Sequence, residues 1–200
     1  MINLEHKIVA YTFDELSSDA KEVAKGKILE IDRDPMIFSG DLIDFLECEY
    51  GLNNLKTYYS LSYCQGDGLC LYGNIYDNEL FDNEKFSKIA FKGIHWKQKE
   101  GLRSVLSGIT FTHHGRYYHE RSVTIDSDSY NASDKQYVVI DKIVENIEKW
   151  YFEFCNEWKG IGYDYFYEIT DEDASYFCND NDILFHENGK KVSGEYCIAS

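Results

Sequence analysis

The clearest pattern in the chain is a run of apolar residues at three- and four-residue steps, which predicts one long amphipathic helix over roughly residues 135–160. Its apolar positions are Ile140, Ile143, Val144, Ile147, Trp150, Tyr151, Phe154 and Trp158. Because this apolar face is broad, we expect the helix to lie in the core of the protein.

Polar capping residues and shorter apolar repeats predict further helices. Thr12 and Glu15 have the spacing of a capping box, so a first helix is expected to follow them through Ile28 and to end before Asp32-Arg33-Asp34-Pro35. A second helix is expected to be capped by Ser39-Gly40-Asp41 and terminated by Gly51. Three more are expected over residues 82–92, over residues 97–107, and from Thr170 through Phe177.

Between the helices, the apolar pattern changes to that of paired strands. Residues 55–63 and 69–75 flank the turn Gly66-Asp67-Gly68, which predicts a β-hairpin. Similar hairpins are expected for residues 109–112 with 117–125, and for 183–186 with 190–192. Hairpins interleaved with helices predict an α+β fold with an antiparallel sheet, and a single proline favours one compact domain over residues 1–200.

Charge changes this picture by separating the ends of the chain from its middle. The net charge is −16, with −7 in residues 1–50, −8 in residues 151–200 and −1 in the central hundred residues. An acidic surface repels nucleic acid and attracts basic proteins. We therefore expect a protein partner and no direct contact with nucleic acid.

Two groups of carboxylates are the candidates for a partner-binding surface. They are Asp41, Asp44, Glu47 and Glu49 in the second helix, and Asp164, Glu168, Asp171, Glu172 and Asp173 in the C-terminal quarter. Acids in the first turn of a helix are also favoured by the helix dipole, which accounts for part of the second group. If the surface imitates DNA, its carboxylates should be spaced about 7 Å apart, as phosphates are along one strand.

Other candidate chemistry is sparse. His113, His114 and His119, with Glu120 and Asp126 nearby in sequence, are the strongest candidate metal ligands, although ordinary polar strand and turn residues are the simpler interpretation. Cys64 precedes Asp67, whose charge opposes thiolate formation, so a structural turn is favoured there over a nucleophile. We expect no metal, no cofactor and no enzymatic activity.

The location of the protein follows from two absences in the sequence. Residues 1–7 carry no basic region followed by an apolar run, so no secretory signal is expected, and the longest apolar runs are far too short for a membrane span. The cysteines are scattered and are expected to be free thiols. These features predict a cytoplasmic protein.

Three stretches carry a resemblance: Tyr11–Ser17, Tyr59–Gly68 and Gly115–Glu120. They resemble a diffuse group of small accessory proteins encoded by bacteriophages and prophages, some of which are labelled antitoxins. The resemblance implies a phage gene that counters host defences, and no catalytic residues are carried over from it. Some anti-CRISPR proteins are small, acidic DNA mimics that occupy the nucleic-acid channel of a nuclease, and this chain is compatible with that role by analogy.

The resulting expectation is a phage-encoded inhibitor in the host cytoplasm. It would bind a defence protein, with a CRISPR effector as its target, and block the nucleic-acid site by steric and electrostatic occlusion. Two alternatives stay open. One is an antitoxin-like partner of a basic toxin, and the other is a small metal-dependent enzyme built on His113, His114 and His119.

Overall fold

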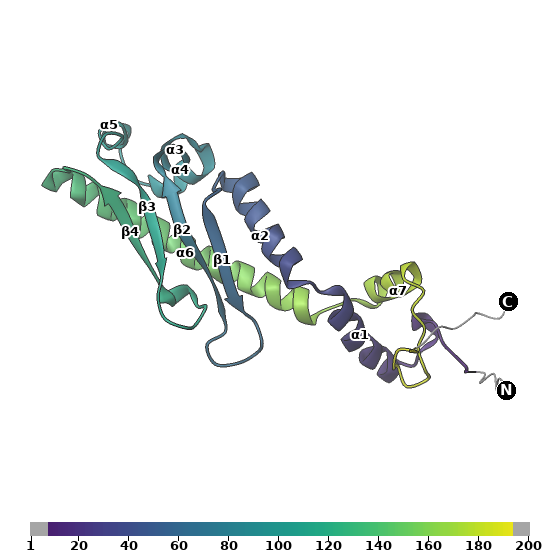
Figure 1. Ribbon diagram of the computed structural model, residues 1–200. Coiled ribbons are helices and arrows are strands. Elements are labelled where there is room, and N and C mark those ends of the chain that lie inside the picture. Colours follow the sequence, from purple (N-terminus) through teal and green to yellow (C-terminus); the bar gives the residue numbers. More distant parts are fainter. Residues whose placement is uncertain (1–7, 194–200) are drawn as a thin grey trace, which may run out of the picture. The chain divides into compact units, whose positions relative to one another are not determined.

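The computed structural model describes residues 8–193 (Figure 1). Residues 1–7, for which no secretory signal is expected, and Cys197 lie outside this range. The predicted α+β class is confirmed: within the described residues the chain forms seven α-helices, two short 3-10 helices and a four-stranded antiparallel sheet. Contacts divide the chain into a terminal unit (residues 1–34 and 163–200) and a central unit (residues 35–162). The expected single domain over residues 1–200 stays a prediction, to be measured as the cooperativity of unfolding.

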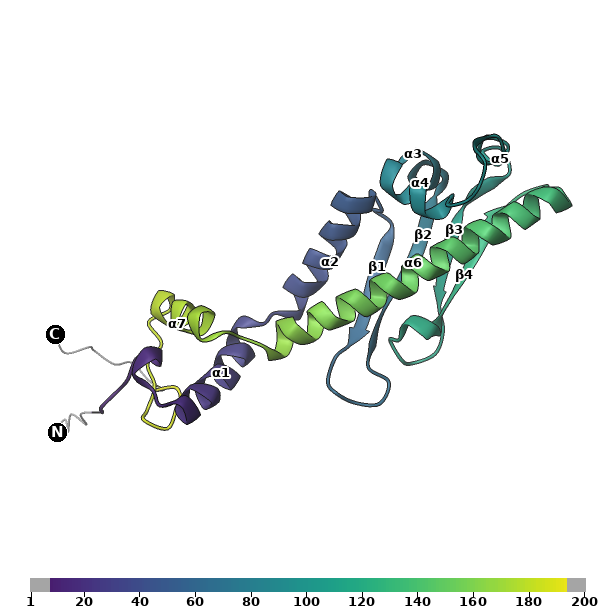
Figure 2. The ribbon, with the colours of Figure 1, turned by 180° about the vertical axis from the view of Figure 1, so that it is seen from behind.

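The sheet of the central unit is a meander in the order β1-β2-β3-β4. Its strands are β1 (Leu55–Ser60), β2 (Gly68–Tyr76), β3 (Leu106–His113) and β4 (Val123–Ser129). Two of the three predicted hairpins, β1–β2 and β3–β4, are therefore confirmed, although the return strand expected over residues 117–125 begins only at Val123. Figures 1 and 2 show that helix α6 lies along one face of the sheet, whereas no helix of residues 8–193 covers the opposite face. We call this opposite side the open face.

Helix α6 (Asp134–Tyr167) is the predicted long helix, extended at its C-terminal end. Its buried side chains include Ile143, Ile147 and Tyr151, and the Tyr151 ring lies 5.6 Å from the ring of Phe111 on β3. On β1 and β3, buried apolar residues alternate with more exposed polar ones, so that the apolar set faces α6. One face of the sheet therefore provides the core and the other stays accessible.

The region between β2 and β3 differs from the prediction. In place of two helices over residues 82–92 and 97–107, three short helices form: α3 (Asp77–Asp82), α4 (Glu84–Ala90) and α5 (Trp96–Glu100). The Asn83 side chain accepts a hydrogen bond of 2.8 Å from the backbone N–H of Phe86, and this cap separates α3 from α4. Residues from Leu106 onward pair with β2 and β4, because pairing in the sheet outweighs their helical pattern.

The terminal unit is built from both ends of the chain. It contains the 3-10 helix η1 (Phe13–Glu15), helix α1 (Ser18–Asp32) and helix α7 (Asp171–Asp180). The predicted capping box is present but it caps η1, and α1 begins only at Ser18, after its own cap at Ser17. The predicted C-terminal hairpin is reduced to a single bridge between Phe185 and Lys191.

The core of this unit consists of apolar residues from η1, α1, α7 and the C-terminal segment. They are Phe13, Leu16, Ala20, Ala24, Ile28, Ala174, Cys178, Ile183 and Phe185. By sequence, the terminal unit holds seventeen acidic and seven basic residues, a net charge of −10, which leaves −6 for the central unit. Most of the charge asymmetry of the sequence therefore belongs to one unit.

Candidate acidic partner-binding surface

Helix α2 (Pro35–Tyr50) presents the first group of predicted carboxylates. It begins at Pro35, not at the predicted cap around residues 39–41, because proline needs no hydrogen-bonded N–H at the first helical position. Its buried residues Phe38, Leu42 and Leu46 recur every four positions and fix one face in the core. Gly51, with φ +64°, ends the helix as predicted.

Three acids lie on the exposed side of this helix. Asp41, Asp44 and Glu47 follow one another at three-residue steps, and all three are exposed. No ion pair within the described residues involves any of them. We call these residues the acidic stripe, since they form a row of carboxylates that no cation of the described chain neutralises.

Glu49, the fourth predicted acid of this helix, faces a cation of the chain itself. Its Oε1 lies 2.6 Å from the Nζ of Lys85 on the neighbouring helix α4. A partner would have to compete with Lys85 for this carboxylate. Glu49 is therefore a weaker candidate for a partner contact than the acidic stripe.

The second predicted group lies on the terminal unit and is also divided by its contacts. Asp171 pairs with Lys25 at 2.5 Å and with Lys21 at 3.6 Å, linking α7 to α1. The hydrogen bond from Lys25 is the main cause that lowers the pKa of Asp171 below its ordinary value. This carboxylate therefore has a structural role within the unit.

Asp173 belongs to the N-terminal cap of α7. Its backbone N–H donates to Thr170 Oγ1 at 3.1 Å, and Thr170 Oγ1 donates to its carboxylate at 2.7 Å. Asp164, Glu168 and Glu172 are exposed and take part in no ion pair of the described residues. The predicted set of nine acids therefore contains three tied carboxylates and six that are available to a partner.

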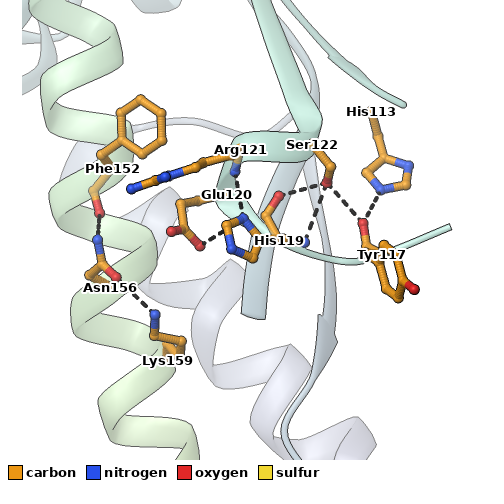
Figure 3. A network of polar contacts seen from close by, with 9 residues as sticks. All are labelled: His113, Tyr117, His119, Glu120, Arg121, Ser122, Phe152, Asn156 and Lys159. Carbon is orange, nitrogen blue, oxygen red and sulfur yellow. Dashed lines mark hydrogen bonds and ion pairs between the residues drawn. The ribbon is translucent and has the colours of Figure 1, made fainter. Parts of the chain in front are cut away.

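The three histidines do not converge on a common point. In Figure 3, His113 points to the backbone carbonyl of Tyr117, at 2.9 Å, whereas His119 points toward Glu120 and the backbone of Arg121. No cluster of three or more histidine, cysteine or carboxylate side chains in residues 8–193 is arranged to hold a metal ion. The enzyme alternative therefore has no geometric support in this part of the chain.

His119 has a capping role that also explains its contact with Glu120. Its Nδ1 accepts a hydrogen bond of 3.0 Å from the backbone N–H of Arg121, at the start of the 3-10 helix η2 (Glu120–Ser122). A nitrogen that accepts this bond carries no proton, so its approach to the buried Glu120 carboxylate, at 3.5 Å, is not an ion pair. The polar contacts of Figure 3 thus hold the β3–β4 loop in place.

The turn between β1 and β2 is structural, as the sequence indicates. The Cys64 thiol donates to Asp67 Oδ1 at 3.0 Å, and this bond raises the pKa of Cys64 above its ordinary value. Asp67 also accepts the backbone N–H groups of Ser62 and Cys64, and Gly66 has φ +99°. Since the thiolate is disfavoured, Cys64 is not suited to act as a nucleophile.

A second surface was missed by the sequence analysis. Four rings gather on the open face of the sheet, and we call them the tyrosine platform: Tyr58, Tyr72, His113 and Tyr118. Tyr58 and Tyr72 are stacked, with ring centroids 4.2 Å apart and an interplanar angle of 15°, and Tyr118 lies 5.0 Å from Tyr58. A hydrogen bond with the Tyr58 side chain is the main cause that raises the pKa of Tyr72 to about 12.

The tyrosine-rich segments are visible in the sequence, but the platform depends on strand register. Tyr58 pairs with Cys70, and Lys56 pairs with Tyr72, so the two tyrosines are diagonal neighbours on one face. A shift of one residue would turn one of them toward the core. The alternation of residues therefore predicted the strands, whereas the register that brings Tyr58 and Tyr72 together could not be predicted from it.

Within residues 8–193 no helix is both long enough and apolar enough to cross a bilayer. No curated protein and no solved structure matches the chain. A family described as a domain of unknown function, DUF8835, matches residues 16–171. This range begins just before α1, includes the acidic stripe and the tyrosine platform, and ends at the first residue of α7. The chain therefore belongs to the DUF8835 family.

Proposed function

We propose that this protein is a non-catalytic inhibitor that uses the acidic stripe to occupy a basic, nucleic-acid-binding site on a protein partner. The observation that carries the proposal is the row of exposed carboxylates at Asp41, Asp44 and Glu47, which no described cation neutralises. Unpaired surface acids of one sign are costly to gather, because their charges repel one another. Binding of a basic partner would relieve this repulsion, and the relief would increase the affinity of the complex.

The spacing of the stripe favours imitation of a single nucleic-acid strand over a duplex. A helix rises about 1.5 Å per residue, so the stripe carries one charge per roughly 4.5 Å over about 9 Å. Measured in the same way, as rise along the axis and not as the distance of about 7 Å between neighbouring phosphates, one strand of DNA carries a charge per about 3.4 Å and the duplex one per about 1.7 Å. The stripe is close to the first value and far below the second.

The biological setting of the proposal comes from the resemblance to phage accessory proteins. In that setting the partner is a host defence protein, and a guide-loaded CRISPR effector is the target to test first. Such an effector holds its heteroduplex and displaced strand in positively charged channels. An acidic stripe on a rigid helix is complementary to such a channel.

The experiment is a competition assay with neutralised variants. The purified chain is added to a guide-loaded effector nuclease, and the polarisation of labelled target DNA is followed. The variant Asp41→Asn, Asp44→Asn, Glu47→Gln should lose at least tenfold in inhibitory potency, because rim charges steer association and add affinity. Raising the salt concentration should weaken the wild-type chain more than this variant.

The matched control removes three charges from elsewhere on the surface. Glu30, Glu84 and Glu145 are each ion-paired within the chain, to Lys27, Lys88 and Lys142. Replacing these three acids with glutamine changes the net charge equally and should leave inhibition within about twofold, since such exposed pairs contribute little. No displacement by the wild-type chain, or equal losses in the two variants, would count against the proposal.

A further inference from the structure

The open face of the sheet carries a surface whose chemistry is opposite to that of the acidic stripe. We propose that the tyrosine platform and its surrounding cations bind single-stranded nucleic acid, by stacking of bases and contact with phosphates. This inference goes beyond the proposed function and does not depend on it. It concerns a different surface of the central unit and a different class of ligand.

The rings of the platform are ordered and accessible. Tyr58 and Tyr118 are 39% and 38% exposed, which leaves ring surface for a ligand although each ring contacts its neighbours. The Tyr58–Tyr72 stack fixes the orientation of Tyr58 before any ligand arrives. Aromatic side chains held on an antiparallel sheet are suited to single-stranded nucleic acid, because each base can stack on a ring without regard to sequence.

The β3–β4 loop borders the platform and is held against the β1–β2 turn. A side chain added at Gly66 would collide with the ring of Tyr117, and one at Gly68 would collide with the backbone of residues 118 and 119. His113 is anchored to the Tyr117 carbonyl, as Figure 3 shows. Because the loop is supported in this way, Tyr118 is presented to the open face at a fixed position.

The charge around the platform is positive, although the whole chain is acidic. Lys56 lies directly opposite Tyr72 in the strand register, and Arg116 lies 4.9 Å from the Tyr117 ring centroid. Arg121 is exposed in η2 but points toward Phe152 on α6 in Figure 3, so it is not counted here. Lys56 and Arg116 are the cations placed to contact phosphates.

The acids close to the platform in the chain are withdrawn from the surface or already bonded. Glu120 is only 7% exposed. The Asp67 carboxylate accepts hydrogen bonds from the backbone of its own turn. At physiological salt, exposed charges more than about 8 Å away are largely screened. The net charge of −16 therefore does not decide what binds at this position.

Polar residues at the other side of the open face limit where a strand would run. Thr110 donates to Asp128 at 2.7 Å, and Asp126 pairs with Thr110 in the register. These carboxylates on β4 would repel phosphates. The nucleic acid is therefore expected to follow the β1–β2 hairpin and the β3–β4 loop, with room for only a few nucleotides.

The test uses the full-length protein and fluorescein-labelled oligonucleotides of about ten nucleotides, oligothymidine and oligouridine, with a duplex of the same length. At about 50 mM salt, fluorescence anisotropy should give a Kd on the order of 10–100 µM for the single strands, a value expected for non-specific binding. The duplex should bind at least tenfold more weakly. Two phosphate contacts predict a slope of about −1.4 for log K against log salt.

Substitutions locate the site. Tyr58→Ala and Tyr118→Ala should each weaken binding about fivefold or more, as loss of one stacked base does. Lys56→Gln should weaken binding and reduce the salt slope. The control is Tyr130→Ala, since Tyr130 is 72% exposed and is not part of the platform. The neutralised acidic-stripe variant should bind the oligonucleotides at least as tightly as the wild type does.

Several outcomes would overturn the inference. One is no anisotropy change with about 100 µM protein at low salt. A second is an equal loss in Tyr130→Ala and the platform variants, and a third is tighter binding of the duplex. If Tyr58→Ala alters the circular dichroism spectrum, Tyr118→Ala and Lys56→Gln decide the result, because both side chains are exposed. If neutralising the acidic stripe weakens inhibition of the effector but the protein binds no oligonucleotide, this inference is refuted and the proposed function is not.

Discussion

Removal of the Asn146 side chain should destabilise the central unit, although Asn146 contacts no candidate ligand. Asn146 lies among the apolar residues of α6 and is only 9% exposed. Its Nδ2 donates to the carbonyls of Ala90 and Lys92, both at 3.0 Å. These bonds satisfy two carbonyls at the end of α4 and tie that end to the core helix.

The magnitude follows from the two hydrogen bonds. Each contributes a net of about 0.5–1.5 kcal/mol, so Asn146→Ala should cost about 2 kcal/mol. For a chain of this length, a loss of that size lowers Tm by roughly 4–8 °C. Asn146→Asp should be worse, because a carboxylate would then face two carbonyl oxygens without a proton to donate.

Thermal and urea unfolding, followed by circular dichroism, measure the effect. The control is Asn156→Ala on the same helix, whose exposed amide donates to the Phe152 carbonyl one turn earlier and accepts from Lys159 Nζ, both at the surface. This variant should stay within about 0.5 kcal/mol of the wild type. If Asn146→Asp were as stable as the wild type, or if the two alanine variants lost equal stability, the account of the buried amide would be refuted.

Three further predictions concern single residues. Gly189→Ala should destabilise the terminal unit in urea unfolding by about 1–3 kcal/mol, because Gly189 has φ +77° and an added Cβ would meet the Ala20 carbonyl; an unchanged midpoint would contradict this. Asp171→Asn should lower stability near neutral pH, since the hydrogen bond from Lys25 lowers the pKa of Asp171, and the difference from the wild type should disappear as the pH falls through that lowered pKa. A loss of stability that persists in acid would argue against the ion pair. Cys64 should react with iodoacetamide at pH 8 more slowly than a cysteine in an unstructured peptide, because its pKa is raised. Mass spectrometry of the alkylated protein measures the rate, and equal or faster modification would contradict this reasoning.

The sequence predicted those parts of the fold that depend on local period and turn chemistry. The apolar spacing around Trp150 located α6, and the glycines at 66 and 68 located the first hairpin. The helix predicted over residues 97–107 forms only as far as Glu100, and Leu106 and Ser107 already belong to β3. Leu106 pairs with Ser129 on β4, a residue distant in the sequence, and the local pattern carries no information about that pairing.

The candidate surface shows the same division. Exposure of Asp41 and its neighbours followed from the buried face of α2, so the acidic stripe could be predicted. The pairing of Asp171 with Lys25 joins residues far apart in the sequence, and nothing in the local pattern indicates it. Of two acids that look alike in sequence, one is therefore available to a partner and the other is a structural element.

The distribution of thiols allows a fluorescent label to be attached selectively to α2, the helix that carries the acidic stripe. Among the described cysteines, Cys70, Cys155 and Cys178 are buried, and Cys64 is exposed but hydrogen-bonded. Cys48 is exposed on α2, one position after the end of the acidic stripe. An environment-sensitive dye attached there would lie beside any molecule that covers the stripe. Binding of a partner to the stripe could therefore be detected as a change in the fluorescence of this dye. The measurement needs neither the identity of the partner nor a substitution in the stripe.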